Sequence, residues 1–289
     1  MTKNLIIKTS YSKLPNGEIK PNFGDLIRAS VLLNCIKGDF VWLTDKRSIN
    51  LLKYFIDLNK IINIETFDEK LVVDNIYNID NYVANEQVFK KIKGNWHGFI
   101  WDGKKLNPEN DLIKITAPPY DFSNKKSWQQ ALIGAMGFKW QQQDYFLKSI
   151  ENKEIIDIGF NWHVNQEWTS KQWPKKNWKE LEKLLKKDYS VSWQQGLNNF
   201  DEYVNWLSSC KLIITCETLG LHLALALKKK VIAFVGPAES NEFPYSRLIL
   251  AKPSPRDCMP CFLSECKFKK TCLNEVEPKE IYRIVSQFF

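Results

Sequence analysis

The stretch LIITCETLGLHLALAL, Leu212–Leu227, decides the fold. Its first five residues, LIITC, are mostly apolar, as in a strand that is buried on both faces of a parallel sheet. The polar tip Glu217-Thr218 follows. The run Leu219–Leu227 is then apolar all round, which predicts a helix buried on most sides. A strand, a polar tip and a buried helix recur in nucleotide-binding domains, because the free amides at the helix start favour an anion such as a diphosphate.

Four residues of this region are candidates for the site. Thr218 offers a hydroxyl to a phosphate, and the Glu217 carboxylate can accept hydrogen bonds from ribose or sugar hydroxyls. His222 lies on an apolar helix, where a satisfied core histidine is the default interpretation. Gly236 shapes a loop after the next strand, on the same carboxyl edge of the sheet. In open α/β sheets ligands bind beyond this edge.

Strand-like and helix-like runs alternate along the whole chain, which is typical of an α/β protein with parallel sheets. The 289 residues suit two domains, and the polar, Gln-rich stretch 124–153 is the best boundary candidate. We therefore expect one domain over residues 1–150 and a second over 151–275. We expect residues 276–289 to form a C-terminal helix that packs back toward the first domain.

The expected strands are Asn4–Thr9, Phe40–Thr44, Ile61–Thr66, Leu71–Asp74, Gly98–Asp102, Ile155–Phe160, Ser190–Trp193, Leu212–Cys216 and Val231–Val235. The expected helices are Asp25–Ile36, Ser48–Ile56, Trp128–Gly137, Asn177–Lys187, Phe200–Ser208, Leu219–Leu227 and Pro278–Phe288, and Leu14–Phe23 is expected to be a loop.

Charge and composition exclude several function classes. The 41 basic and 33 acidic residues give a net charge of +8, but only five of the basic residues are Arg. Because arginine forks dominate specific base and phosphate readout, this balance disfavours a nucleic-acid reader. The 11 tryptophans are scattered rather than interleaved with basic residues. No apolar run reaches the length of about 18 residues that a membrane span needs, and the start lacks a signal-peptide pattern, so we expect a cytoplasmic protein.

Two further clusters could carry chemistry. Gly24-Asp25 stands where a loop meets a helix, so the carboxylate is either a helix cap or a base that faces a cleft. Thr169-Ser170-Lys171 lies between a strand and a helix. It offers two hydroxyls and a point charge suited to phosphate oxygens, or it is simply a helix entrance.

Four of the seven cysteines fall between Cys258 and Cys272. The set Cys258, Cys261, Cys266 and Cys272 opens with a CxxC knuckle and could supply a tetrahedral thiolate site for structural zinc or iron. The alternative is reduced thiols that pack a loop, since disulfides are disfavoured in the cytosol.

Taken in order, these motifs resemble glycosyltransferase family 9, the heptosyltransferases that build lipopolysaccharide core and relatives that glycosylate proteins. The resemblance is dense from about Lys171 to Cys272 and thinner before residue 150. Its carriers are GDLIRAS (24–30), KQWP followed by NWKEL (171–174 and 177–181), ETLGLHLALAL (217–227), FVGP (234–237) and the CxPC…C…C tail (258–272).

The resemblance implies a GT-B fold, with two Rossmann-like domains that face each other across a cleft. It also implies an inverting transfer of a sugar from a nucleoside-diphosphate sugar, with ADP-heptose as the best guess. Asp25 would be the general base, and Lys171 would neutralise the leaving diphosphate without a catalytic metal. Donor binding would fall to Thr169, Ser170, Lys171, Glu217, Thr218, Gly220, His222 and Gly236.

The resemblance also implies partners and an alternative. The acceptor would be a surface glycan, lipopolysaccharide or another glycolipid, or a protein, and the enzyme could associate peripherally with the inner face of the cytoplasmic membrane. No nucleic acid is expected. Glu217 replaces a family aspartate and Leu219 a small residue. The alternative is therefore a catalytically silent GT-B-like protein that binds a nucleotide sugar or acts as a scaffold, with a structural metal.

Overall fold

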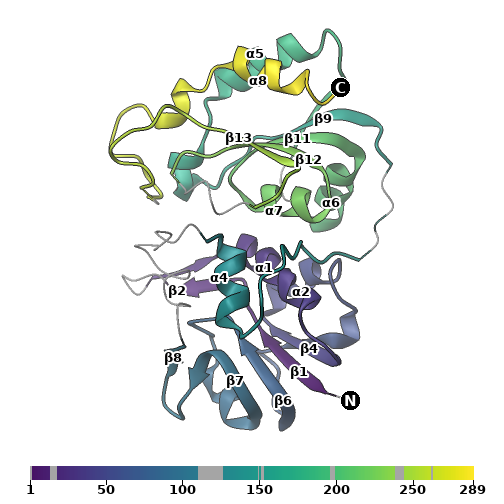
Figure 1. Ribbon diagram of the computed structural model, residues 1–289, viewed down its shortest axis with the longest axis vertical. Helices are drawn as coiled ribbons and strands as arrows, with labels where there is room; N and C mark the ends of the chain where they lie inside the picture. The colour runs from purple at the N-terminus through teal and green to yellow at the C-terminus, as the bar shows by residue number, and fades with distance from the viewer. Residues whose placement is uncertain are drawn as a thin grey trace. The chain divides into compact units, whose positions relative to one another are not determined.

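The computed structural model describes residues 2–13, 18–109, 126–148, 150, 153–195, 199–237, 244–261 and 263–289. The chain divides into two compact units, Met1–Ser149 and Ile150–Phe289. Each unit has its own predominantly parallel sheet with helices packed on it (Figure 1). The expected α/β class is therefore confirmed in both halves of the chain.

The sheet of the first unit has the strand order β5-β4-β1-β6-β7-β8. All neighbours are parallel except β7 and β8, which are antiparallel. The strands are β1 (Lys3–Ile7), β4 (Asp39–Thr44), β5 (Ile61–Asn63), β6 (Leu71–Asn78), β7 (Ile92–Trp101) and β8 (Leu106–Pro108). β1 is central because its apolar residues, Leu5–Ile7, are fully buried. The strand order reverses at β1, and ligands bind beyond the carboxyl end at such a switch point.

A short antiparallel hairpin, β2 (Tyr11–Lys13) and β3 (Ile19–Pro21), follows β1 where the sequence predicts only a loop. The helices of this unit are α1 (Phe23–Ala29), α2 (Lys46–Leu52) and α4 (Trp128–Ala135). The single helix expected over residues 25–36 is wrong in its second half, where Ser30–Asn34 form a 3₁₀ helix.

The sheet of the second unit is wholly parallel and has the order β10-β9-β11-β12-β13. The strands are β9 (Ile156–Asn161), β10 (Val191–Trp193), β11 (Cys210–Cys216), β12 (Lys230–Phe234) and β13 (Leu248–Ala251). β13 has no counterpart among the expected strands, because its flanks carry neither a regular alternation nor a long apolar run. The order reverses between β9 and β11, so the switch point lies beyond their carboxyl ends.

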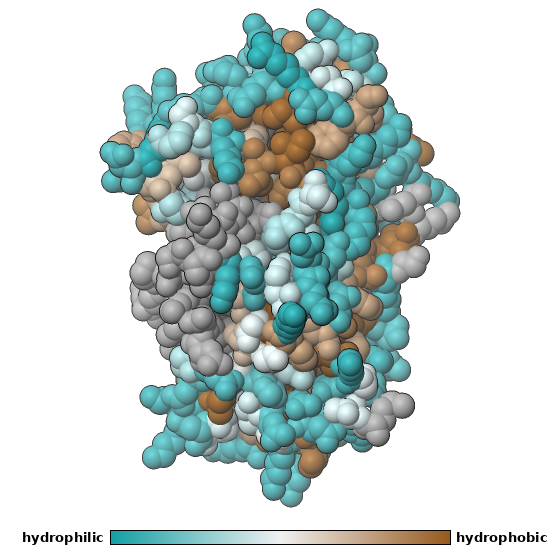
Figure 2. All heavy atoms as spheres, viewed as in Figure 1, coloured by the Kyte–Doolittle hydropathy of each residue, from teal (hydrophilic) through white to brown (hydrophobic). Residues whose placement is uncertain are grey.

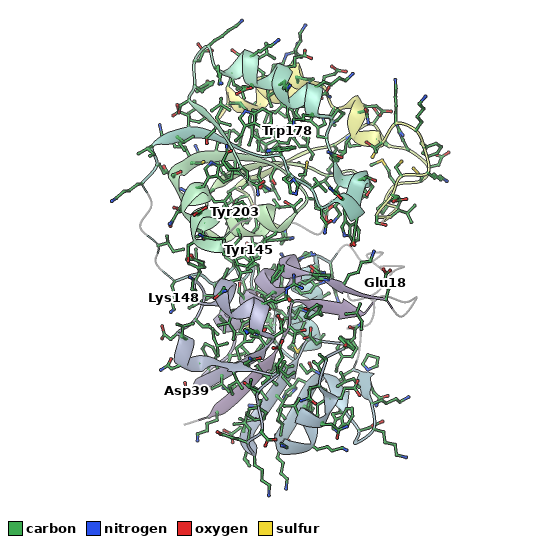
Figure 3. All side chains as sticks on the ribbon, turned by 180° about the vertical axis from the view of Figure 1, so that it is seen from behind. Glu18, Asp39, Tyr145, Lys148, Trp178 and Tyr203 are labelled. Carbon is green, nitrogen blue, oxygen red and sulfur yellow. The ribbon has the colours of Figure 1, made fainter. Side chains whose placement is uncertain are left out.

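Helices cover both faces of this second sheet (Figure 1). α5 (Lys175–Leu185) and α8 (Pro278–Val285) lie on one face, and α6 (Phe200–Ser209) and α7 (Leu219–Ala226) lie on the other. Figure 3 shows the same division, with Trp178 of α5 and Tyr203 of α6 on opposite sides of the sheet. Residues Gly220–Ala226 of α7 are all buried, which explains why this helix is apolar all round.

Tryptophans build much of the second unit's core. Trp178 is fully buried against Phe160, with ring centroids 5.0 Å apart, and Trp173 stacks on Phe234 at 4.3 Å. The indole Nε1 of Trp173 also donates to the Val276 carbonyl, which ties the entrance of α5 to the chain before α8. α8 packs against α5 in this core and belongs to the second unit of the chain, and its expected approach to the first domain stays a prediction.

Within the described residues, no helix combines the length and the apolar character that crossing a membrane would require.

Candidate functional site

The polar tip Glu217-Thr218 follows β11 and lies at the switch point of the second sheet. Thr215 of β11 is paired in register with Asn161 at the end of β9. The Asn161 side chain donates from Nδ2 to Thr215 Oγ1 (2.7 Å) and to Thr218 Oγ1 (3.0 Å). Thr218 is the N-cap residue of α7. The start of α7 is thus held beside the end of β9, where its free amides form a ready site for an anion.

Lys171 and Glu217 form an ion pair, with 2.9 Å between Nζ and Oε1. Lys171 ends the 3₁₀ helix Gln166–Lys171, which follows β9, and its ammonium also lies 4.7 Å from the ring centroid of Trp168. Only 9% of the Glu217 side chain is exposed, and its second oxygen, Oε2, has no hydrogen-bond partner among the described residues. The pair therefore presents one cation and one free carboxylate oxygen beside the tip of β11.

Gly220 is required by the close packing of this region. A Cβ atom built on it would lie 2.2 Å from Asn161 Nδ2 and 2.3 Å from the Tyr203 hydroxyl. These two groups are themselves hydrogen-bonded, since the Tyr203 hydroxyl lies 2.7 Å from Asn161 Oδ1. Gly220 therefore lets the first turn of α7 approach the end of β9.

The hydroxyls of Thr169 and Ser170 have different surroundings. Thr169 is exposed and lines an open cavity of about 460 Å³ together with Lys175 and Lys269. Ser170 is buried, and both its amide and its hydroxyl donate to carbonyls of the cysteine-containing loop, those of Ser264 and Leu263. The geometry thus gives Ser170 a role in anchoring that loop.

Gly236 and His222 pack inside the second unit. A Cβ on Gly236 would meet Cys272 Sγ at 2.7 Å and the Leu273 side chain at 3.1 Å, so the glycine permits the 3₁₀ helix Cys272–Glu275 to pack on the end of β12. His222 is buried within α7 with 6% exposure.

Asp25 lies in the first unit, in the first turn of α1. The N-cap of this helix is Asn22, whose side chain accepts from the Asp25 amide and donates to Asp25 Oδ2 (2.5 Å). Capping therefore explains Asn22, whereas the Asp25 carboxylate is left 22% exposed with Arg28 Nη1 at 3.6 Å. Oδ2 therefore accepts from Asn22 and Oδ1 faces Arg28, while part of the carboxylate stays exposed, so Asp25 remains a candidate general base.

The position of Asp25 follows from a polar cluster at the end of β1. The Asn22 amide donates to the Ser10 carbonyl, which closes the base of the β2–β3 hairpin. The Ser10 amide donates to Asp45 Oδ2 (2.6 Å), the N-cap of α2. The hairpin therefore delivers α1 back to the carboxyl end of β1, the switch point of the first sheet.

A buried ion pair completes that cluster. Lys8 Nζ lies 2.5 Å from Asp80 Oδ1, and the Thr9 amide donates to the other oxygen. Burial raises the pKa of the Asp80 carboxyl, and the Lys8 ammonium and the Thr9 amide oppose this shift.

The comparisons with known proteins bear on the second unit most directly. Residues 196–272 match the family model described as glycosyltransferase family 9 (heptosyltransferase). The resemblance to family 9 is confirmed. None of the curated proteins matches the chain.

Solved structures extend the family 9 likeness to the whole fold. E. coli heptosyltransferase WaaC with ADP-2-deoxy-2-fluoro heptose is 15% identical, with a TM-score of 0.64 over 99% of this chain and 100% of that one. E. coli ADP-heptose lps heptosyltransferase II is 16% identical, with a TM-score of 0.65 over 99% and 98%. The iron-containing dodecameric glycosyltransferase TibC from enterotoxigenic E. coli is 13% identical, with a TM-score of 0.61 over 99% and 75%. The expected GT-B fold is thereby confirmed.

The four cysteines of residues 258–272 are candidates for a metal centre. Cys258, Cys261, Cys266 and Cys272 are all free and half-buried. Burial raises the pKa of the Cys272 thiol, and the negative charges of the Cys261 and Cys266 thiolates raise it further. The three side chains are therefore close enough to interact. Among the described residues, however, no three His, Cys, Asp or Glu side chains converge as metal ligands. Structural zinc or iron there stays a prediction, which elemental analysis of the purified protein tests.

Three residues of this candidate site escape sequence reasoning. Asn161 ends a strand, Tyr203 lies in an amphipathic helix and Trp168 precedes the Thr-Ser-Lys cluster. Only the position of Asn161 at a strand end carried a signal, because polar residues there face the ligand edge of the sheet.

Proposed function

We propose that the protein is an inverting glycosyltransferase that moves a sugar from a nucleoside-diphosphate sugar to an acceptor hydroxyl. The observation that carries the proposal is the Lys171–Glu217 pair beside the open start of α7. A cation and helix amides suit a leaving diphosphate, and a carboxylate with a free oxygen suits sugar hydroxyls. ADP-heptose is the first donor to test, because solved structures of the similar heptosyltransferase WaaC contain ADP-2-deoxy-2-fluoro heptose and ADP.

In the proposed reaction, Asp25 takes the proton of the acceptor hydroxyl, and the acceptor oxygen attacks the anomeric carbon from the face opposite the diphosphate. The bond between the anomeric carbon and the diphosphate oxygen breaks, and its electron pair leaves with the diphosphate. Lys171, Thr218 and the first amides of α7 stabilise the charge that develops there. These groups supply the stabilisation from the chain itself, so no catalytic metal is invoked.

Binding and turnover test different parts of the proposal. Wild-type protein should be stabilised thermally by ADP or an ADP-sugar, and Lys171→Ala should abolish the shift. Lys183→Ala, at an exposed lysine of α5, is the matched control and should keep it. Release of nucleoside diphosphate from the donor should fall at least about 100-fold in Asp25→Asn. No shift with any nucleotide sugar would overturn the proposal.

The same pair of measurements separates a silent binding protein from an enzyme. A silent protein would bind nucleotide as tightly as a transferase, but the wild type and Asp25→Asn would release equally little diphosphate. The free oxygen of Glu217 suits a sugar hydroxyl in either case, because a buried acceptor is left without a donor, so turnover is the measurement that decides.

For the acceptor we propose a glycan, glycolipid or protein reached at the inner face of the cytoplasmic membrane. The loop between β13 and α8 exposes Leu263 and Phe268, which are 48% and 49% exposed. Phe268 is flanked by the exposed lysines Lys267, Lys269 and Lys270. Hydrophilic and apolar residues are mixed where this loop is drawn (Figure 2). Basic and apolar side chains together suit an anionic lipid surface.

Co-sedimentation with vesicles tests the membrane contact. Vesicles with anionic lipid should retain the protein, and neutral vesicles should not. K267E/K269E/K270E should lose the binding. K176E/K179E/K183E, which changes the charge equally on exposed lysines of α5, should keep it. Equal binding of both triple variants to the anionic vesicles would show that Lys267, Lys269 and Lys270 do not form the membrane contact.

A further inference from the structure

A chain of hydrogen bonds runs from Tyr203 through Asn161 to Thr218. Asn161 and Tyr203 are 1% and 4% exposed, whereas Thr218 is half-buried. The chain thus begins in the core, on α6, and ends at the N-cap of α7, where the proposed diphosphate site opens.

The direction of each hydrogen bond is fixed by chemistry. Asn161 Oδ1 can only accept, so the Tyr203 hydroxyl donates to it. Burial raises the pKa of Tyr203, which keeps the phenol protonated and able to donate. The amide is thereby oriented with Nδ2 toward the two threonines, and Nδ2 can only donate to them.

The two threonines then differ in what their own protons do. The Thr215 hydroxyl lies 2.7 Å from the Cys216 carbonyl and donates to it. The Thr218 oxygen accepts from Asn161, and no described residue accepts the Thr218 proton. The Thr218 hydroxyl is therefore left as a donor at the site.

The same contact removes Thr218 from its usual task. An N-cap threonine commonly turns its oxygen to an amide of the first helical turn. In α7 the side chain makes no such bond, because its oxygen faces Asn161. Leu221 N–H donates to the Thr218 carbonyl, so the amides of Leu219 and Gly220 are the ones that the side chain of Thr218 leaves open to an external acceptor.

We propose that Asn161 and Tyr203 are positioning residues of the diphosphate site, which hold Thr218 as a hydrogen-bond donor and keep the α7 amides uncapped. The inference rests on the proposed function, since it assigns the donors to the diphosphate of the sugar nucleotide. Neither residue touches the ligand in this assignment, and each acts through Thr218.

The test compares ADP and inorganic diphosphate with adenosine, which lacks phosphate, by calorimetry on the full chain. Asn161→Ala and Tyr203→Phe should each weaken ADP and diphosphate binding about tenfold, the loss expected for one charge-assisted hydrogen bond. Adenosine affinity should change less than about twofold, because the base and ribose do not use these donors. A role confined to folding would lower all three affinities alike.

A double-variant cycle decides whether Asn161 acts through Thr218. In a Thr218→Val background, Asn161→Ala should weaken ADP binding by less than about a further twofold, because the hydroxyl that Asn161 positions is already absent. The inference would be overturned if the losses of ADP affinity in the two single variants multiplied in the double variant. It would also be overturned if the affinities for adenosine and for ADP fell equally. Should Asn161→Ala fail to fold, the conservative Tyr203→Phe carries the same cycle.

The failure of this inference is distinguishable from failure of the proposed function. If variants at Asn161 and Tyr203 bind ADP like the wild type, the inference fails while Asp25-dependent turnover can still stand. If the phosphate-specific losses occur but Asp25→Asn turns over like the wild type, the proposed transfer mechanism fails and the positioning stands. Absence of ADP and diphosphate binding in the wild type would overturn both.

Discussion

Lys171 Nζ lies 2.9 Å from Glu217 Oε1, so the cation that we assign to the diphosphate is already paired with a carboxylate. A diphosphate that binds there must share the ammonium with Glu217. Opposed charges at such distances interact by a few kcal/mol at an effective dielectric constant of about 20. We therefore expect the pair to tune nucleotide affinity.

The first prediction concerns this sharing. Glu217→Gln should strengthen ADP binding by at least about threefold, because it removes a negative charge beside the diphosphate and releases Lys171. Affinity for the ADP-sugar should gain less, since the free carboxylate oxygen that receives sugar hydroxyls becomes part of a neutral amide. Calorimetric titration with both ligands measures the difference. Weaker ADP binding in the variant would contradict the prediction.

The second prediction separates the buried thiols from those of the cysteine loop. Burial raises the pKa of both Cys210 and Cys216 to about 12, so neither forms appreciable thiolate near neutral pH. Iodoacetamide should therefore leave both unmodified in the native protein and label them only after denaturation. Cys258, which is half-buried on the loop, is the internal comparison and should react first. Mass spectrometry of peptides reports each site.

The sequence predicts most of the second unit because its strands and helices are strongly patterned. The run Leu212–Leu227 indicates a buried strand, a ligand-facing tip and a buried helix, and all three are present. Asn161 and Tyr203 could not be assigned, because their roles depend on contacts between residues 42 and 57 positions apart in the chain. Long-range pairs of this kind leave no periodic trace in the sequence.

The first unit is predicted less completely for a physical reason. Its hairpin, Tyr11–Pro21, has strands of only three residues, which are too short to show an alternation. The sequence does not single out Asn22 as the cap of α1, because Asp25 is an equally good capping residue type. Ser170 shows the same limit, since only the folded chain reveals that its hydroxyl is bonded to the cysteine loop.

The third prediction concerns acid stability. Lys211 and the Ser190 amide lower the pKa of Asp157 to about 2. The unfolded value is about 3.9, so the contribution to stability is complete above that pH and is lost as the pH falls toward 2. Asp157→Asn should cost about 1 kcal/mol at pH 6, a value discounted because a quarter of the side chain is exposed.

Urea unfolding followed by tryptophan fluorescence at pH 6 and at pH 2.5 measures this effect. The gap between wild type and Asp157→Asn should narrow at the lower pH, where the wild-type carboxyl begins to be protonated. Glu180→Gln, at an exposed carboxylate of α5, is the control and should show a small gap at both values. A gap that widens on acidification would show that the sign is wrong.

The last prediction contrasts two helical glycines. Gly220→Ala puts a methyl group 2.2 Å from Asn161 Nδ2 and 2.3 Å from the Tyr203 hydroxyl, and these two buried side chains are joined by the hydrogen bond from the Tyr203 hydroxyl to Asn161 Oδ1. Because neither can move without breaking that bond, the variant should lose about 2–3 kcal/mol of unfolding free energy and its ADP binding. Gly134 of α4 has no atom within 4 Å of its Cβ position.

Gly134→Ala should therefore be neutral or stabilise the protein by up to about 1 kcal/mol, because alanine loses less conformational entropy in a helix. It should leave ADP binding unchanged. Thermal unfolding and ADP titration of the two variants side by side measure both effects. Retained ADP binding in Gly220→Ala would mean that α7 can shift away from Asn161 without loss of function. The close packing of the first turn of α7 against Asn161 would then not be required for ADP binding.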